Sequence, residues 1–309
     1  MLPIAEFERF REAIADLPMK GLGEKYARAE LIRPHLLLFS DSGLDVYYVP
    51  FHFVNGSARV VLLGLTPGWT QMEEAFRAAR KGLAEGLDGR MLFERIDRTG
   101  SFSGPMRRNL VEMLDRIGLN SQLRIETCHG LFDTSSRLAH FTSAVSAPIF
   151  KQGENYRGYG PRLLEVPRLK QWVVENLARE LASIPKAIVI PLGGVADEVI
   201  MFLAERRLFD SSRCLIGFPH PSGANGHRKE QFTRGRERWR GQVAEWFARQ
   251  ASEVSRCQRI ESLQYGQCRL RAVLTHYWEL RKPCQTQTGA LPEASRPASG
   301  QRQNQYRSQ

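Results

Sequence analysis

The sequence has 309 residues, 42% of them hydrophobic and 25% charged, which is enough to bury a substantial core. The five cysteines are widely spaced and include no Cys-x-x-Cys pair, which argues against a disulfide framework and against a zinc or iron-sulfur site. No apolar run is as long as a membrane span, and residues 1–11 carry charges where a signal peptide has its apolar core. We therefore expect a globular, cytoplasmic protein with no membrane partner, metal or cofactor.

The net charge of +11 points to a polyanionic partner such as DNA, because Lys and Arg side chains that neutralise phosphates supply affinity for any sequence. Residues 251–309 contain nine Lys/Arg and four Asp/Glu, so +5 of this charge lies at the end of the chain. Residues 285–309 are rich in Gln, Ser, Arg, Pro and Gly, a composition typical of disorder. We expect residues 251–309 to form a basic, disordered tail.

Residues 1–57 are predicted to form helices and short strands that pack on the main domain. Ile4, Phe7, Phe10 and Ile14 follow the three- and four-residue steps of an amphipathic helix. Residues 36–40 and 46–54 are predicted to be short strands that lead into the main domain.

The apolar run at 60–63 is typical of a strand that is buried on both faces. It ends abruptly in the turn Gly64-Leu65-Thr66-Pro67-Gly68, and the pattern of residues 72–83 predicts a covering helix. In open α/β sheets, ligands bind outside the carboxyl ends of the strands. The turn at 64–68 is therefore the first place to look for chemistry.

The rest of the chain alternates between strands and helices up to residue 250. A turn at 100–105 precedes a helix that has Pro at its first position, and the Gly/Tyr/Asn-rich loop at 151–161 is long enough to suggest a function. We predict strands at 140–145, 187–192 and 214–218, and helices at 168–183, 195–206 and 229–250. This alternation predicts an α/β fold over residues 58–250, a three-layer α/β/α sandwich with a central, mostly parallel sheet.

The turn at 64–68 and the loop His220-Pro221-Ser222-Gly223-Ala224-Asn225 each follow a predicted parallel strand, so both should lie at one edge of the sheet. With His227-Arg228, these motifs make residues 58–248 resemble the uracil-DNA glycosylase superfamily. Its members flip a damaged base out of the DNA duplex before they cleave the glycosidic bond. The resemblance implies a monofunctional DNA glycosylase, a hydrolase of base excision repair that releases uracil or a related deaminated base. We expect it to act on damaged DNA as a monomer.

The resemblance also assigns roles to individual residues. His220 would donate a hydrogen bond to the base oxygen that gains charge as the bond breaks, and Thr66 would position the attacking water. Phe102 would stack on the flipped base and Ser143 would read its edge. The other predicted base-binding residues are Gly64, Leu65, Pro67 and Gly68. The predicted DNA-binding residues are Ser222, Gly223, Ala224, Asn225, His227 and Arg228.

Two residues depart from the family's pattern. Thr66 stands where many members have Asp or Asn, and its hydroxyl is a poor base. Ser143 replaces an Asn, and it cannot make the paired donor and acceptor contacts that distinguish uracil from cytosine. These residues keep a second hypothesis open, a DNA- or nucleobase-binding protein with little or no hydrolytic activity. An unrelated nucleotide-binding enzyme is less favoured, because the sequence has neither a G-x-G-x-x-G fingerprint nor a P-loop.

Overall fold

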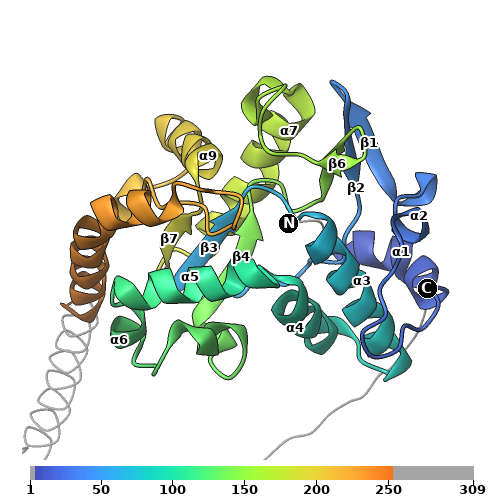
Figure 1. Cartoon of the computed structure of the whole chain (residues 1–309), viewed down its shortest axis with the longest axis horizontal. Helices are drawn as coiled ribbons and strands as arrows, with labels where there is room; N and C mark the ends of the chain where they lie inside the picture. The colour runs from blue at the N-terminus through green and yellow to red at the C-terminus, as the bar shows by residue number, and fades with distance from the viewer. Residues whose placement is uncertain (1–3, 253–309) are drawn as a thin grey trace, which may run out of the picture. The chain divides into compact units, whose positions relative to one another are not determined.

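Two separate β-sheets organise the part of the chain that the structure, a computed structural model, describes: residues 4–252 (Figure 1). These residues belong to one compact unit, Met1–Glu253. The predicted tail lies outside the described residues, except for 251 and 252, which are helical. The fold is mixed α/β, as the alternating pattern predicted.

The first sheet is parallel and has β3 (Val60–Gly64) at its centre, between β4 (Ala139–Ser143) and β7 (Ile188–Pro191). Every residue of β3 is buried, as its unbroken apolar run predicted. The strand predicted at 214–218 is shorter than expected, because only Cys214 forms an isolated parallel bridge, to Val189. The chain turns away at residues 216–217, before a second pair of residues joins the ladder.

Apolar clusters cover both faces of the parallel sheet, because successive side chains of β3 point to opposite sides. Val61 and Leu63 belong to one cluster, and Val60 and Leu62 belong to the other. The helices of the first cluster are α7 (Pro167–Trp172), a π-helical turn (Val173–Leu177), α8 (Ala178–Ala182) and α9 (Gly194–Glu205). Those of the second are α5 (Pro105–Arg116), α6 (Leu119–Leu123) and the helix at 228–252. Figure 1 shows α7 and α9 on one side of the strands and α5 and α6 on the other.

The second sheet is antiparallel and joins the N-terminal segment to residues that follow β4. Its strands, in order, are β1 (Leu37–Asp41), β2 (Leu44–Tyr47), β5 (Ile149–Lys151) and β6 (Glu154–Asn155). The strand predicted at 46–54 is shorter, and the predicted loop at 151–161 begins with the β5–β6 hairpin. Val46 pairs with Ile149, and both side chains are fully buried, which explains why these distant segments associate.

A third apolar cluster holds the N-terminal helices against the domain. It contains residues of α1 (Ile4–Ala15), α2 (Arg28–Leu31), α3 (Trp69–Ala84) and α4 (Gly89–Gly100). Short 3-10 helices lie at Pro34–Leu36, Cys128–Phe132, Ser136–Leu138, Leu163–Glu165 and Ser211–Arg213. Within residues 4–252, no helix combines the length and the apolar character that crossing a bilayer requires.

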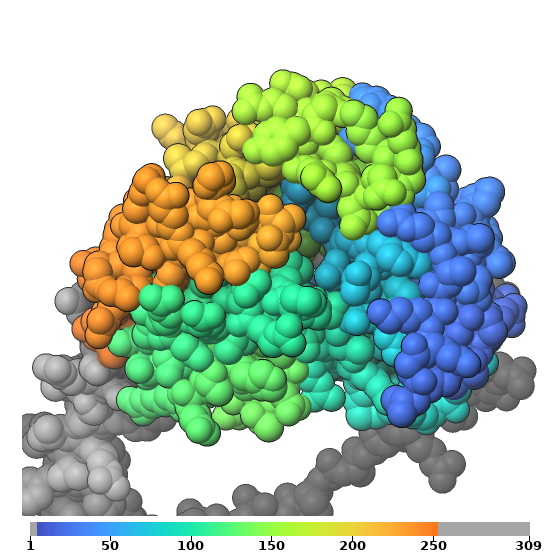
Figure 2. Space-filling view, viewed as in Figure 1, coloured from blue at the N-terminus to red at the C-terminus, as the bar shows by residue number. Residues whose placement is uncertain are grey.

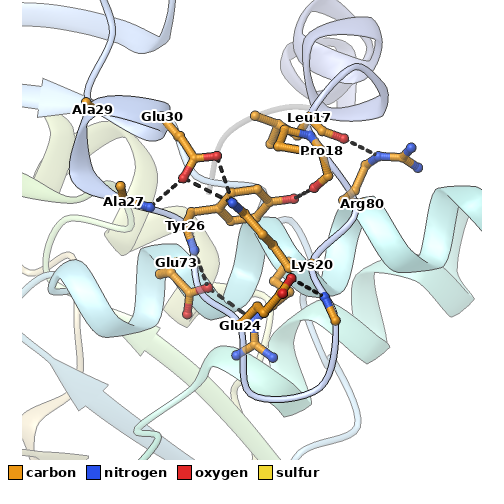
Figure 3. Close-up of polar contacts among 12 residues, drawn as sticks. Leu17, Pro18, Lys20, Glu24, Tyr26, Ala27, Ala29, Glu30, Glu73 and Arg80 are labelled. Carbon is orange, nitrogen blue, oxygen red and sulfur yellow. Dashed lines mark hydrogen bonds and ion pairs between the residues drawn. The ribbon is translucent and has the colours of Figure 1, made fainter.

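A group of polar side chains fastens the segment before α2 to α3 (Figure 3). We call Lys20, Tyr26, Glu30 and Glu73 the N-terminal polar cluster. The Tyr26 amide donates to Glu73 Oε1 over 3.2 Å, and the Tyr26 hydroxyl donates to the carbonyl of Pro18 over 2.9 Å. Lys20 donates to Glu30 over 2.9 Å and lies 5.0 Å from the centre of the Tyr26 ring. These contacts join residues 20–30 to one another and to α3.

Candidate active site

A cavity of about 860 Å³ lies at the carboxyl ends of the parallel strands. Figure 2 shows a hollow bordered by the orange, lime and cyan segments of the chain. The predicted site residues that line the cavity are Gly64, Leu65, Thr66, Pro67, Gly68, Phe102, Ser143, His220, Ser222, Ala224 and Asn225. Gly223, His227 and Arg228 are outside its lining. The two loops that the sequence placed at one edge of the sheet therefore share one cavity.

Gly64, Phe102 and Ser143 meet in what we call the aromatic pocket. Gly64 pairs with Ser143 at the ends of β3 and β4. A Cβ atom placed on Gly64 would lie 3.2 Å from Ser143 Oγ and 3.5 Å from Phe102 Cε1. A side chain at position 64 would therefore enter the space beside the aromatic ring, where a flat ligand could stack.

Phe102 adopts an unusual backbone conformation for an aromatic residue, with φ at +49°. Such a left-handed conformation costs about 1–3 kcal/mol and persists only where the surroundings hold it. Arg107 Nη2 donates to the carbonyl of Ser101 over 2.7 Å, and the Phe102 ring packs against Phe141 with centroids 6.0 Å apart. These contacts fix the ring in the wall of the cavity.

His220 is held as a neutral side chain with its proton on Nε2. The Ser222 amide donates to His220 Nδ1 over 3.2 Å, and an amide can only donate, so Nδ1 must be the unprotonated nitrogen. Burial lowers the pKa of His220, which favours the neutral ring. His220 is therefore a hydrogen-bond donor through Nε2–H at the cavity.

Gly193, at the end of β7, allows His220 to approach the sheet closely. Its φ is +95°, and a Cβ atom placed on it would lie 3.0 Å from His220 Cβ. Any other residue at position 193 would combine backbone strain with a tight contact. The conformation of Gly193 therefore helps to set the position of His220.

The loop that follows His220 is braced mainly from within. Ser222 Oγ accepts from the Ala224 amide over 3.1 Å, and Asn225 Nδ2 donates to the carbonyl of His220 over 3.3 Å. Arg228 Nη1 donates to the carbonyl of Ser222 over 2.8 Å. Arg228 therefore supports the loop from outside the cavity, whereas its predicted contact with DNA stays a prediction.

The turn at 64–68 is also constrained by hydrogen bonds. Thr66 Oγ1 donates to the carbonyl of Ala147 over 2.6 Å, so this hydroxyl keeps only its acceptor sites for a water molecule. The Gly68 amide donates to Gln71 Oε1 and the Trp69 amide donates to Asn155 Oδ1, each over 2.9 Å. The first amides of α3 are thus occupied by side chains.

Sequence reasoning missed several residues that line the cavity. The loop at 151–161 contributes Asn155, Tyr156, Arg157 and Tyr159, and its length was the signal that could have placed it here. Arg157 is exposed and brings positive charge to the lining. In residues 4–252, no cluster of His, Cys, Asp and Glu side chains is suited to holding a metal ion.

Asp97, His140 and Glu180 also line the cavity, although each is almost fully buried. We call this group the deep polar chamber. His140 Nε2 and Glu180 Oε1 lie 2.7 Å apart, and within residues 4–252 no protein group is a hydrogen-bond partner for His140 Nδ1. Burial raises the pKa of Asp97 to about 7. Burial would also raise the pKa of Glu180, but the hydrogen bond from His140 outweighs it and holds that pKa below its usual range.

The fold and the cavity together define an α/β protein whose site is built on loops at the carboxyl ends of parallel strands. The chain is 33% identical over 243 residues to the uncharacterized protein YoxB of Bacillus subtilis (strain 168), an alignment that covers 78% of this chain and 93% of YoxB. The chain therefore belongs to the same family as YoxB. No family model matches the sequence, and no solved structure matches it.

Proposed function

We propose that the protein is a monofunctional DNA glycosylase that hydrolyses the N-glycosidic bond of a deaminated base, such as uracil, during base excision repair. In this proposal, the domain is a three-layer α/β/α sandwich. The protein acts on DNA in the cytoplasm as a monomer and needs no metal or cofactor. Its support is the convergence of Gly64, Phe102, Ser143 and His220 in one cavity at the edge of the parallel sheet.

The hydrogen bond from the Ser222 amide to His220 Nδ1 carries the proposal. In glycosidic hydrolysis, water adds to C1′ as the C1′–N bond breaks, and the electron pair of that bond leaves with the base as an anion. The proton that the water loses passes to solvent, which in turn reprotonates the released base. A preorganised donor beside the base oxygen stabilises this anion more than it stabilises the bound substrate. A neutral His220 with Nε2–H in the cavity meets this requirement, and it need not lose a proton during the reaction.

The other residues would orient the substrate. The Phe102 ring offers a face on which a flipped base could stack, and Ser143 offers one hydroxyl beside Gly64. Thr66 could orient water through its acceptor sites, because its proton is directed to Ala147. Its contribution to the rate should be smaller than that of His220, because a hydroxyl is a poor general base.

The test is base release from oligonucleotides that contain uracil, hypoxanthine or xanthine. His220→Ala should lower the rate of release by about 10²–10³, as expected when one oxyanion donor is lost, and should change DNA affinity only a few-fold. His129→Ala is the matched control, because His129 is exposed and outside the cavity lining. Base release that is unaffected by His220→Ala would contradict this mechanism.

A binding protein on the same fold is the second candidate, and the hydrogen bond of Thr66 favours it. The turn at 64–68 contains no carboxylate, and its one hydroxyl donates to Ala147. Such a protein would bind DNA that contains a flipped-base analogue and would release no base. Tight analogue binding without release from any of the three lesions would favour this candidate over the glycosylase.

A further inference from the structure

The cavity continues beyond the residues that would hold a uracil ring. At about 860 Å³ it lies near the upper end of the range of about 300–1,000 Å³ for small-molecule sites. Its lining includes the deep polar chamber, where the exposed fractions of Asp97, His140 and Glu180 are 6%, 2% and 7%. None of these residues has a task in the mechanism above.

The aromatic pocket and the deep polar chamber share two walls. On α4, Asp97 lies one helical turn before Ser101, whose amide donates to the carbonyl of Asp97 over 2.9 Å, and Phe102 follows directly. On β4, His140 lies three residues before Ser143, so the two side chains leave opposite faces of the strand, yet both line the one cavity. A ligand seated against Phe102 and Ser143 therefore lies in the same cavity as the chamber.

The chamber contains a polar atom whose environment points to a ligand. His140 is 98% buried, and its Nε2 is engaged by Glu180, whereas Nδ1 has no protein partner in the described part of the chain. Buried polar atoms are nearly always hydrogen-bonded, so an unpartnered one in a cavity wall calls for an explanation. With Nε2–H directed at Glu180, the lone pair of Nδ1 is available as an acceptor.

The available groups of the chamber favour hydrogen-bond donors and positive charge. Two of its three side chains are carboxyl groups, of which Glu180 is engaged by His140, and the unpartnered Nδ1 of His140 is the third polar position. Burial raises the pKa of Asp97, and a nearby ammonium group would lower it again, because a cation stabilises the ionised carboxylate. A primary amine supplies both charge and up to three donors.

We propose that the deep polar chamber is a subsite for an amino group on the base, so that the protein prefers a base with a short aminoalkyl arm to unsubstituted uracil. The inference rests on the proposed function and names its substrate class. The short side chain of Ser143 supports this inference, because it leaves more of the cavity open to a substituted base than an Asn side chain would. Asp97 and His140 act in this proposal as specificity residues.

The experiment compares oligonucleotides that contain uracil, 5-aminomethyluracil or 5-ethyluracil, the last being a near-isosteric arm without a donor. Wild-type protein should release the aminomethyl base at least tenfold faster than the ethyl base, because the ethyl arm leaves buried polar groups unpaired. Asp97→Asn and His140→Asn should each bring this ratio close to one. Asp97→Asn keeps the shape of the side chain, and so it tests the chamber if His140→Asn does not fold.

Glu73→Gln is the matched control, because Glu73 is a buried carboxyl outside the cavity lining, and it should leave the ratio unchanged. If the protein releases uracil but the wild type shows no preference, or the two variants retain it, the inference is wrong and the proposed function stands. If no base is released, the proposed function is wrong. Equilibrium binding of the same oligonucleotides then tests the chamber, and equal affinity for the two arms would overturn the inference.

Discussion

The N-terminal polar cluster and the deep polar chamber both place carboxyl groups inside the protein, but they differ in where their polar atoms point. In the N-terminal polar cluster, the groups bind one another and nearby backbone, and none of its residues lines the cavity. Glu73 Oε2 is unpartnered there, yet Glu73 is outside the lining of the cavity. In the deep polar chamber, His140 Nδ1 is unpartnered in the cavity wall. A buried polar group therefore suggests a ligand only when a cavity gives that ligand access.

The largest effect should come from breaking the buried pair in the chamber. Glu180→Ala leaves His140 without its charged partner, and removing one member of such a pair typically costs about 3–5 kcal/mol of unfolding free energy. Replacing both partners with leucine should recover most of that loss, because the desolvation of both polar groups disappears. Urea denaturation measures both changes. A double variant no more stable than Glu180→Ala would contradict this account of the pair.

A smaller loss is expected in the N-terminal polar cluster. Glu73→Ala removes the acceptor of the Tyr26 amide and of Arg77 Nε, at a cost of about 2 kcal/mol, because the buried amide is left unpaired. Glu73→Gln keeps an acceptor oxygen and should lose less. Urea midpoints give the stability, and base release by the folded variants should match the wild type. A large loss of activity in the folded Glu73→Gln protein would mean that the two clusters are not functionally distinct.

The third effect is a dependence of the free energy of unfolding on pH that arises from Asp97. The pKa of Asp97 is raised from 3.8 to about 7 by burial, so the folded protein binds this proton more tightly than the unfolded chain does. Stability from this group is therefore fully present below about pH 4 and is lost as the pH rises towards 7, by at most about 1.4 kcal/mol per pH unit. Subtracting the unfolding free energy of Asp97→Asn from that of the wild type should show this slope. A flat difference would mean that Asp97 is not desolvated.

The sequence was sufficient to place the two loops of the candidate site. The turn at 64–68 follows strand β3, and His220 follows an apolar run that joins the sheet through the bridge of Cys214 to Val189, which brings both loops to one edge. The strand order and the pairing of Val46 with Ile149 were beyond prediction, because long-range pairing depends on which apolar faces fit together.

The deep polar chamber could not be predicted from the sequence. Asp97 and Glu180 resemble ordinary charged residues of amphipathic helices, and His140 resembles a polar residue at the start of a strand. Their association comes from packing between α4, β4 and α8, which carries no local sequence signal. The hydrogen bond that selects the tautomer of His220 was equally hidden, because it depends on the conformation of the loop backbone.

The central position of β3 in the parallel sheet also has a consequence for how the protein is made. Strand β3 leaves the ribosome before both of its neighbours, and β4 and β7 follow only after long intervening segments. Until they arrive, its backbone amides and carbonyls have no partners, and its Val and Leu side chains are exposed to other chains. The nascent protein is therefore open to aggregation through β3 from the time this strand emerges until β4 and β7 pair with it. A holdase chaperone that covers residues 60–63 during this interval would raise the yield of folded protein.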